Sequence, residues 1–266
     1  MTKIISSLQN PLVKNVLLLT EKPRARKDQN RIVIEGRREI GLAISGGFTI
    51  TDLFYAPDLV TVPERDQLTA GSNNIQLVEV TTEVFNGMAY REDSGGLIAL
   101  AEPRRLRLTD LKLRKNPLLL VLETVEKPGN LGALLRTADA ANLDAVIICD
   151  PQTDIYNPNA IRSGIGCVFT MPVVTADSVD AIAWMRKTGI KIFGTALTAK
   201  GFYHKTDFNQ PAAIVMGSEA FGLSSTWLEG ADELVKIPMM GKIDSMNVSA
   251  SAAVVIFEAM RQREFR

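Results

Sequence analysis

The stretch "EKPGNLGALLRTADAANLDAVIICD" (residues 126–150) places a glycine-bearing loop, a helix and an apolar strand in that order. Loops of this kind often hold a nucleotide phosphate at the start of a helix. A dinucleotide-binding fingerprint requires G-x-G-x-x-G and a P-loop requires G-K-[ST], and neither pattern is present. There are only Gly129 and Gly132, with Asn130 between them and Arg136 one turn beyond. The stretch therefore predicts an α/β fold, and it disfavours an unrelated dinucleotide-dependent enzyme.

The alternation of strand and helix continues through the second half of the chain. The predicted strands are "LLLVLETV", "AVIICD", "VFTMPVV", "IKIFGTAL" and "AAIVMGS". Helices are expected between them at about 132–141, 158–166 and 178–188, and a last helix covers "SASAAVVIFEAMRQREF". Nearly all the strands are continuously apolar, which is typical of parallel strands covered on both faces. We expect residues 118–266 to form an α/β domain with a parallel sheet.

The first half of the chain predicts a smaller α/β domain. Its strands are "RIVIEG", "ITDLFYAP", "IQLVEV" and "GLIALAE", and helix-like segments lie between them. Asn10-Pro11 reads as a helix cap followed by proline at the first helical position. The domain is expected to span residues 1–101. The charged segment 102–117, with a proline near each end, is the predicted linker.

Composition excludes several classes of protein. No apolar run reaches the roughly 18 residues of a membrane span, and the start of the chain has no signal-peptide core, so we expect a cytoplasmic protein. Cys149 and Cys167 lack metal or redox spacing and are expected to be reduced core thiols. The single histidine, His204, lies in a polar loop sequence and is expected to be solvated. A histidine-rich metal site cannot be built, and no metal is expected.

The formal net charge of zero hides a basic N-terminus. Residues 1–38 hold nine Lys and Arg against three Asp and Glu, and the densest cluster is the predicted loop "EKPRARKDQNR" (21–31). Basic clusters of this kind contact phosphates. An ordinary solvated loop explains the charge equally well. The candidate cations are Arg24, Arg26, Lys27, Arg31, Arg37 and Arg38.

Three stretches of the second half end strands in unusual ways. They are the opening stretch, "IVMGSEAFGLS" (214–224) and "VKIPMMGKIDSMNVSASAA" (235–253). Taken singly, a glycine at a strand end favours a turn, and Ser or Asn before a helix favours a cap. In a parallel sheet, however, ligands bind outside the carboxyl ends of the strands, and all three stretches lie at such ends. Their combination therefore favours a binding site.

These stretches resemble, in order and at similar separations, the signature motifs of the SpoU (TrmH-like) branch of the SPOUT RNA methyltransferases. The first resembles N-x-G-x-x-x-R-T-A and is supplied by Asn130, Gly132, Arg136, Thr137 and Ala138. The second resembles G-x-E-x-x-G and is supplied by Gly217, Glu219 and Gly222. The third resembles I-P-M-x-G followed by S-L-N-V-S, supplied by Ile237, Pro238, Met239 and Gly241, then Ser245, Met246, Asn247, Val248 and Ser249. Met246 replaces the usual leucine, a volume-conserving change that should be tolerated.

The resemblance covers the whole chain and implies a fold and an activity. It implies a C-terminal domain with a deep trefoil knot, which binds S-adenosylmethionine and forms a homodimer whose partner subunit completes the active site. The N-terminal domain resembles the substrate-recognition domain of ribosomal-RNA members. The implied reaction is methylation of a ribose 2′-hydroxyl in ribosomal RNA. The alternatives are a transfer-RNA 2′-O-methyltransferase and a non-catalytic knotted RNA-binding protein.

The resemblance also assigns candidate site residues. Arg136 would position the reacting hydroxyl or act as a phosphate-assisted base. Asn130 would fix Arg136 or the sugar of the substrate, and Glu219 would orient Asn130 or Arg136 through its carboxylate. Ser245 and Asn247 would line the point of transfer. The expected cofactor contacts are Thr195, Ala196, Leu197, Met216, Gly217, Ile237, Met239, Met246 and Val248. The basic N-terminal residues become expected RNA contacts. No metal is needed for this chemistry.

Overall fold

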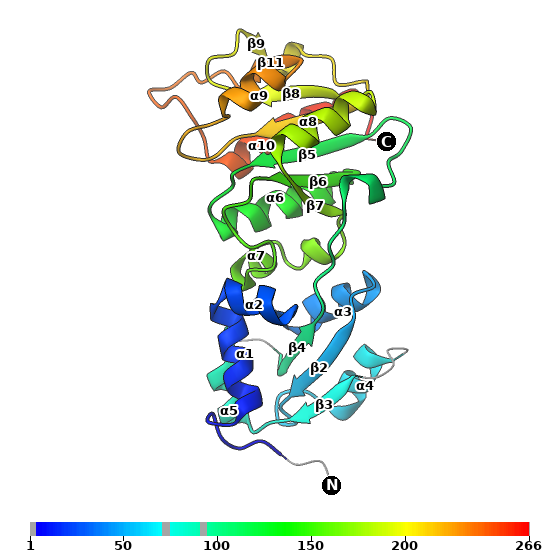
Figure 1. Ribbon diagram of the computed structural model, residues 1–266, viewed down its shortest axis with the longest axis vertical. Helices are drawn as coiled ribbons and strands as arrows, with labels where there is room; N and C mark the ends of the chain where they lie inside the picture. Colours follow the sequence, from blue (N-terminus) through cyan, green and yellow to red (C-terminus); the bar gives the residue numbers. More distant parts are fainter. Residues whose placement is uncertain (1–3, 71–74, 91–94, 266) are drawn as a thin grey trace. The chain divides into compact units, whose positions relative to one another are not determined.

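The computed structural model describes residues 4–70, 75–90 and 95–265. The chain forms two compact units (Figure 1). The first comprises Met1–Arg104 and Tyr156–Thr170, and the second comprises Arg105–Ile155 and Met171–Arg266. Residues 156–170 follow a strand of the second unit along the chain but pack with the first. The chain therefore passes from one unit to the other three times, at residues 104–105, 155–156 and 170–171.

The first unit is built on a mixed four-stranded sheet. Its strands are β1 (Ile32–Glu35), β2 (Ile50–Tyr55), β3 (Gln76–Glu79) and β4 (Leu97–Ala101), in the order β1-β4-β2-β3. β4 is antiparallel to both β1 and β2, and β3 is parallel to β2. These strands match the four segments predicted from the sequence. The smaller α/β domain expected in the first half of the chain is confirmed.

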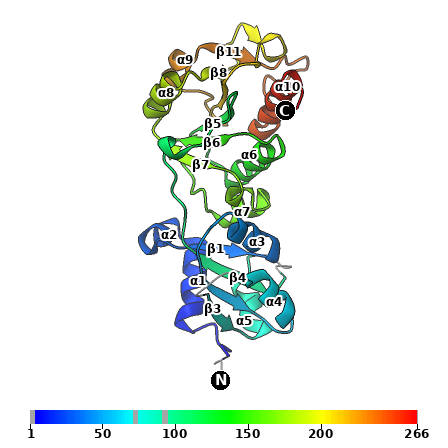
Figure 2. The same cartoon turned by 90° about the vertical axis from the view of Figure 1, so that its right-hand side faces the viewer.

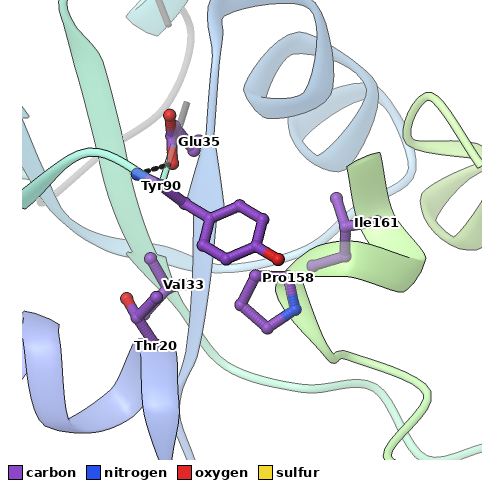
Figure 3. Close-up of a pocket in the computed structure, with 6 residues that line it drawn as sticks. All are labelled: Thr20, Val33, Glu35, Tyr90, Pro158 and Ile161. Atoms are coloured by element: carbon purple, nitrogen blue, oxygen red, sulfur yellow. Dashed lines mark hydrogen bonds between the residues drawn. The ribbon is translucent and has the colours of Figure 1, made fainter. Parts of the chain in front are cut away.

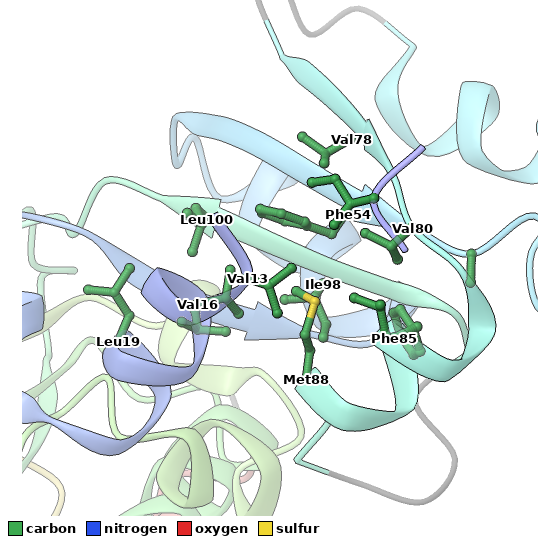
Figure 4. Close-up of a cluster of buried hydrophobic side chains, with 14 residues drawn as sticks. Val13, Val16, Leu19, Phe54, Val78, Val80, Phe85, Met88, Ile98 and Leu100 are labelled. Atoms are coloured by element: carbon green, nitrogen blue, oxygen red, sulfur yellow. The ribbon is translucent and has the colours of Figure 1, made fainter. Parts of the chain in front are cut away.

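One face of this sheet is covered by α1 (Pro11–Glu21) and α5 (Thr82–Met88). The side chain of Asn10 accepts the N–H of Leu12 and begins α1, as the sequence predicts. Val13, Val16 and Leu19 share one face of the helix because they are spaced three residues apart. Figure 4 shows these side chains pointing at Phe54, Ile98, Leu100 and the side chains of α5, which form a continuous buried core.

The opposite face of the sheet carries α3 (Arg37–Ser45), with α4 (Val62–Thr69) beside it. The inserted segment adds α7 (Pro158–Ser163), which contacts β1, and a 3-10 turn η2 (Cys167–Phe169), which contacts α3. The ring of Phe169 meets that of Phe48 edge-on at 5.0 Å between centroids. Phe169 is buried in these contacts, and it belongs to the segment "VFTMPVV" that was predicted as a strand. That prediction was wrong at its start, because the strand begins only at Val173.

The basic segment predicted as a loop forms a second helix. α2 (Pro23–Gln29) has Pro23 in its first turn and ends at Asn30, which adopts the left-handed conformation. Periodicity could not reveal this helix, since its seven residues carry no apolar stripe. Its ends are instead marked by Pro and Asn, the residue types favoured at these positions.

The second unit is built on a seven-stranded sheet in which every pair is parallel, and the predicted parallel sheet is confirmed. Its strands are β5 (Leu118–Glu123), β6 (Ala145–Cys149), β7 (Val173–Ala176), β8 (Lys191–Thr195), β9 (Gly201–Phe202), β10 (Ala212–Met216) and β11 (Glu233–Lys236). The order is β7-β6-β5-β10-β8-β11-β9. β10 therefore lies between two strands that precede it in the chain.

Helices cover both faces of this sheet, as the apolar strands predict. α6 (Pro128–Ala140) packs against α10 (Val248–Gln262) on one face. α8 (Ser178–Lys187) and α9 (Ser225–Gly230) lie on the other (Figure 2). Trp227 of α9 is fully buried there and donates to the Ser178 hydroxyl at 2.7 Å. This arrangement leaves the loops after β5, β8, β10 and β11 at one edge of the sheet.

Both cysteines are buried and neither forms a disulfide, in agreement with the sequence. Burial, with smaller contributions from Asp150 and Glu123, raises the pKa of the Cys149 thiol to about 12. The thiolate is therefore absent at neutral pH, and Cys149 is a packing residue. Across the described residues, no helix is long and apolar enough to cross a membrane. The same residues contain no group of three His, Cys, Asp or Glu side chains able to hold a metal ion.

Candidate active site

Side chains from the three unusual stretches meet at the carboxyl edge of the seven-stranded sheet. Asn130, in the first turn of α6, donates from Nδ2 to Oε1 of Glu219 at 2.6 Å. Asn247, at the start of α10, donates from Nδ2 to Oδ1 of Asn130 at 3.1 Å. Residues 89 and 117 positions apart are thus joined in one hydrogen-bonded chain. The convergence expected from the parallel sheet is present in the structure.

The orientation of Asn247 is determined by the helix that it caps. Its Oδ1 accepts the backbone N–H of Ser249 at 3.0 Å and that of Ala250 at 3.4 Å. Because the amide oxygen is held by the helix N-terminus, the amide nitrogen faces Asn130. The residue is therefore both a cap and a member of the cluster, two readings that the sequence presented as alternatives.

A tight loop presents Glu219. Ser218 and Gly222 exchange two backbone hydrogen bonds, each of 3.0 Å, across the turn. Gly217 lies so close to this turn that a Cβ there would be 2.1 Å from the carbonyl carbon of Gly222. Oε1 of Glu219 accepts from Asn130, whereas Oε2 is buried and has no hydrogen-bond partner among the described residues. One buried oxygen at the site thus remains available to a ligand.

Arg136 and Ser245 are not part of this cluster. Arg136 is exposed on α6, and no hydrogen bond or ion pair joins it to any residue within the described ranges. It follows Asn130 by six positions, which places it roughly 120° around the helix from the amide cluster. Ser245 is exposed and donates to the Asp244 carboxylate at 3.3 Å. Within one chain the structure therefore unites Asn130, Glu219 and Asn247 and leaves Arg136 on a different side of α6.

The predicted cofactor residues surround the same edge. Thr195 ends β8 and donates from Oγ1 to the Val215 carbonyl at 2.8 Å, and Ala196 donates from its backbone N to the Val235 carbonyl at 3.0 Å. These bonds tie the end of β8 to its neighbours β10 and β11. Met216 and Val248 are buried, and Ile237 and Met239 are half-buried. Leu197 and Met246 are exposed.

Large apolar side chains stand in solvent around this edge. Met240 is 94% exposed, and Ile243 beyond it in the same loop is also exposed. Phe221, at the tip of the Glu219 loop, is 89% exposed. They belong to the loops that follow β10 and β11, and a contiguous patch of such side chains would mark a binding surface for a ligand or another protein.

The basic residues of the first unit differ in availability. Arg26 is buried, and its Nη1 donates to the carbonyls of Leu19 and Thr20 at the end of α1. Its prediction as an RNA contact is therefore at odds with the structure, which uses it as a helix cap. Arg31, Arg37 and Arg38 pair with Asp52, Glu64 and Glu39 respectively. Arg24, which lies 3.5 Å from Asp28, and Lys27 are both exposed.

Glu123 is a site-adjacent residue that the sequence analysis missed. It ends β5, is buried, and accepts the backbone N–H of Ser224 at 2.9 Å through Oε2. It thereby ties the end of the Glu219 loop to the strand that leads into α6. The signal was available, since Glu123 is the one charged residue inside the apolar run "LLLVLETV".

Two family profiles match this chain. The SpoU rRNA Methylase family matches residues 117–257, and the MRM3-like substrate binding domain matches residues 10–99. The 23S rRNA (guanosine(2553)-2′-O)-methyltransferase RlmP of Bacillus subtilis is 29% identical over 96% of this chain and 98% of its own. The 23S rRNA (guanosine-2′-O-)-methyltransferase RlmB of Ralstonia nicotianae is 35% identical over 73% of this chain and 80% of its own.

Solved structures resemble both units together. A crystal structure of an RNA 2′-O ribose methyltransferase is 36% identical, with a TM-score of 0.84 over 98% of this chain and 100% of the other. The AdoMet-bound rRNA methyltransferase from Sinorhizobium meliloti is 29% identical, with a TM-score of 0.89 over 98% of each chain.

Proposed function

This chain belongs to the SpoU rRNA Methylase family, and we propose that it transfers the methyl group of S-adenosylmethionine to a ribose 2′-hydroxyl of ribosomal RNA. The observation that carries the proposal is the chain of hydrogen bonds from Glu219 through Asn130 to Asn247, which unites all three motifs. The intact cluster disfavours a non-catalytic RNA-binding protein. An rRNA substrate also favours the cytoplasm as the compartment.

The cofactor supplies an electrophilic methyl group on a positively charged sulfur. The residues at the carboxyl edge suit such a group, because the buried Oε2 of Glu219, which no described residue contacts by a hydrogen bond, offers an acceptor beside exposed apolar side chains. The residues proposed to hold it are Thr195, Ala196, Leu197, Met216, Gly217, Ile237, Met239, Met246 and Val248. The close approach of Gly217 to Gly222 keeps the loop backbone tight at this place.

The chain's own residues have to orient the hydroxyl and assist the loss of its proton. A ribose hydroxyl is a weak nucleophile, so alignment with the methyl group supplies much of the rate. Arg136 is exposed and makes no hydrogen bond or ion pair with the described residues, and a guanidinium gives up its proton too reluctantly to be a good base. Its planar fork instead suits a phosphate next to the reacting ribose. We assign Arg136 to positioning, Asn130 and Asn247 to the sugar side of the site, and Ser245 to its rim.

A homodimer would complete this site. Arg136 lies on a different side of α6 from the amide cluster of its own chain, and Phe221 and Met240 stand in solvent. A second copy that covers these apolar side chains would bring its own Arg136 toward the cluster. The trefoil knot belongs to the same proposal, supported by the position of β10 between β5 and β8 and by the return of residues 237–247 to α10 beside α6.

The test is methyl transfer from labelled S-adenosylmethionine to total RNA that lacks the modification. Wild type, Arg136→Ala and the control Lys187→Ala are compared, and the product is mapped by nuclease digestion. Lys187 is exposed on α8, on the opposite face of the sheet, so its loss should change nothing. We expect label on a ribose 2′-oxygen of ribosomal RNA, lost only in Arg136→Ala.

Other outcomes separate the alternatives. Label found only in transfer RNA would show that the substrate is tRNA and not rRNA. If the wild type transfers no label and binds no cofactor, the proposal of an enzyme is contradicted, and a non-catalytic RNA-binding protein remains.

A further inference from the structure

The first unit contains a hollow of about 410 Å³ between the end of α1, the end of α5 and the start of α7. Its walls include Leu17, Thr20, Met88, Tyr90, Asn157 and Pro158. A smaller hollow adjoins it, shares Thr20, Tyr90 and Pro158, and reaches Val33 and Glu35 of β1 (Figure 3). The size lies within the range of roughly 300–1,000 Å³ that is usual for small-ligand sites.

We propose that this hollow binds one unpaired nucleobase of the RNA substrate, stacked on Tyr90. The inference rests on the proposed function, because it takes RNA as the substrate. It adds a recognition site in the first unit, separate from the site of methyl transfer, which lies in the second.

Tyr90 supplies the stacking surface. The residue is 47% exposed, although an aromatic side chain on a folded unit normally buries most of its ring. Its backbone N–H donates to Oε2 of Glu35 at 2.8 Å, so its main chain is held to β1. Figure 3 shows its ring beside Val33, with the hydroxyl directed toward Pro158. Within the described part of the chain, that hydroxyl makes no hydrogen bond.

Polar groups at the rim suit the edge of a base. Asn157 caps α7 through Oδ1, which accepts the N–H of Asn159 at 2.9 Å, while its Nδ2 has no partner among the described residues. An amide donor and a phenol hydroxyl beside apolar walls are the groups that read unstacked bases in single-stranded RNA. An apolar ligand would leave both of them unpaired.

The charge beside the hollow suits the RNA backbone. The wall residue Glu21 is followed directly by Lys22, and α2 then adds Arg24 and Lys27. All three cations are exposed. Cations flanking an aromatic side chain are typical of single-strand binding surfaces, where phosphates meet the charges and bases stack on the rings. This charge favours RNA over an apolar peptide.

The experiment uses the full chain and an unmethylated large-subunit rRNA transcript as the probe, with KM for RNA, kcat and cofactor affinity measured at one salt concentration. Tyr90→Leu removes the ring and keeps apolar bulk, Tyr90→Phe keeps the ring, and Asn157→Ser keeps a capping side chain but loses the amide donor. Val62→Ala, at an exposed apolar position on α4, is the control. Because stacking on one base contributes roughly 1–3 kcal/mol, Tyr90→Leu should raise KM for RNA about 5- to 150-fold and leave kcat and cofactor affinity unchanged.

Tyr90→Phe should stay within about threefold of wild type, and Asn157→Ser should raise the KM for RNA less than Tyr90→Leu does. Ultraviolet cross-linking of the wild type to the same transcript should label the peptide that contains Tyr90.

The inference would be overturned by an unchanged KM for RNA in Tyr90→Leu, or by an equal rise of KM in Tyr90→Phe and Tyr90→Leu. Methylation by the wild type would uphold the proposed function in either case. If the wild type methylates no RNA, the proposed function fails, and cross-linking at Tyr90 still decides whether the hollow binds RNA. Should Tyr90→Leu fail to fold, Asn157→Ser and the cross-link decide in its place.

Discussion

At the scale of single residues, the site depends on the direction of two side-chain amides. Asn130 gives its N–H to the Glu219 carboxylate and its oxygen to Asn247, so exchanging either group would break a bond. The motif residues were predictable from the sequence because their types and spacing are specific. Their hydrogen-bond directions were not, since these depend on loops that meet only after the sheet has formed.

We predict that Asn130→Asp lowers kcat about tenfold or more at neutral pH. The variant would place a second carboxylate within hydrogen-bond distance of Glu219, where two like charges raise the pKa of one of them. As the pH falls, one carboxyl takes up a proton and restores a donor, so part of the lost activity should return. The check is kcat against pH for the variant and the wild type. Asn142→Asp, the same change at an exposed turn, should follow the wild-type profile.

Burial was the residue property that the sequence conveyed least well. Arg26 stands in a run of charged residues, yet it lies against the carbonyls that end α1. The last carbonyls of a helix lack internal partners, so a cation nearby is drawn to them. Nothing in the run distinguishes Arg26 from Lys27, which is exposed. The distinction arises only from the turn between α1 and α2.

At the scale of elements, the segment leading into β5 is tied to the loop before β6 by an ion pair. Asp144 is buried, and it accepts from the Arg114 guanidinium at 2.9 and 3.0 Å and from the backbone N–H of Leu118 at 2.9 Å. Burial alone would raise the pKa of Asp144, but the hydrogen bonds from Arg114 and from the backbone hold it below its ordinary value. The charged form is therefore the one that stabilises the fold.

We predict that Asp144→Asn lowers the free energy of unfolding by roughly 2–4 kcal/mol at pH 7. A carboxylate with a lowered folded-state pKa stabilises the protein above its unfolded pKa, near 4, and this contribution is lost as the pH falls through the folded pKa. The difference between variant and wild type should therefore shrink below about pH 4. Denaturant unfolding across this range tests it. Asp66→Asn, which changes an exposed carboxylate paired with Arg65, should cost at most about 1 kcal/mol.

The loop after β10 packs so tightly on itself that a side chain added at Gly217 would not fit. We predict that Gly217→Ala costs about 1–3 kcal/mol of stability and weakens cofactor binding, because its Cβ would overlap the backbone of Gly222. Calorimetric titration of S-adenosylmethionine and thermal unfolding would measure both effects. Gly41→Ala in α3 is the control, since its Cβ would meet only Leu68 at 3.4 Å. Unchanged cofactor affinity in Gly217→Ala would show that the turn is not part of the binding site.

At the scale of the whole molecule, the sequence predicted the elements better than their order. The apolar runs identified the main strands of the parallel sheet, because burial on both faces removes the polar alternation. The insertion of β10 between β5 and β8 has no local signal, since strand order depends on contacts between residues far apart. The assignment of residues 156–170 to the first unit is of the same kind. In the sequence these residues look like an ordinary helix followed by the start of a strand. Only the residues that they contact in the folded chain show that they belong to the first unit.

This division leads to a prediction about the isolated second half of the chain. A fragment of residues 105–266 would keep the segment 156–170 without the unit against which it packs, and would expose Ile161 and Phe169, which are buried in the whole chain. Each such side chain contributes about 1.5–3 kcal/mol when buried. We expect the fragment to aggregate and to unfold at a lower temperature than the full chain. Replacing 156–170 in it by a Gly-Ser linker should restore solubility, because the exposed apolar side chains are gone. If the unaltered fragment remained monodisperse, with the thermal stability of the linker version, the segment would have to fold against the second unit instead.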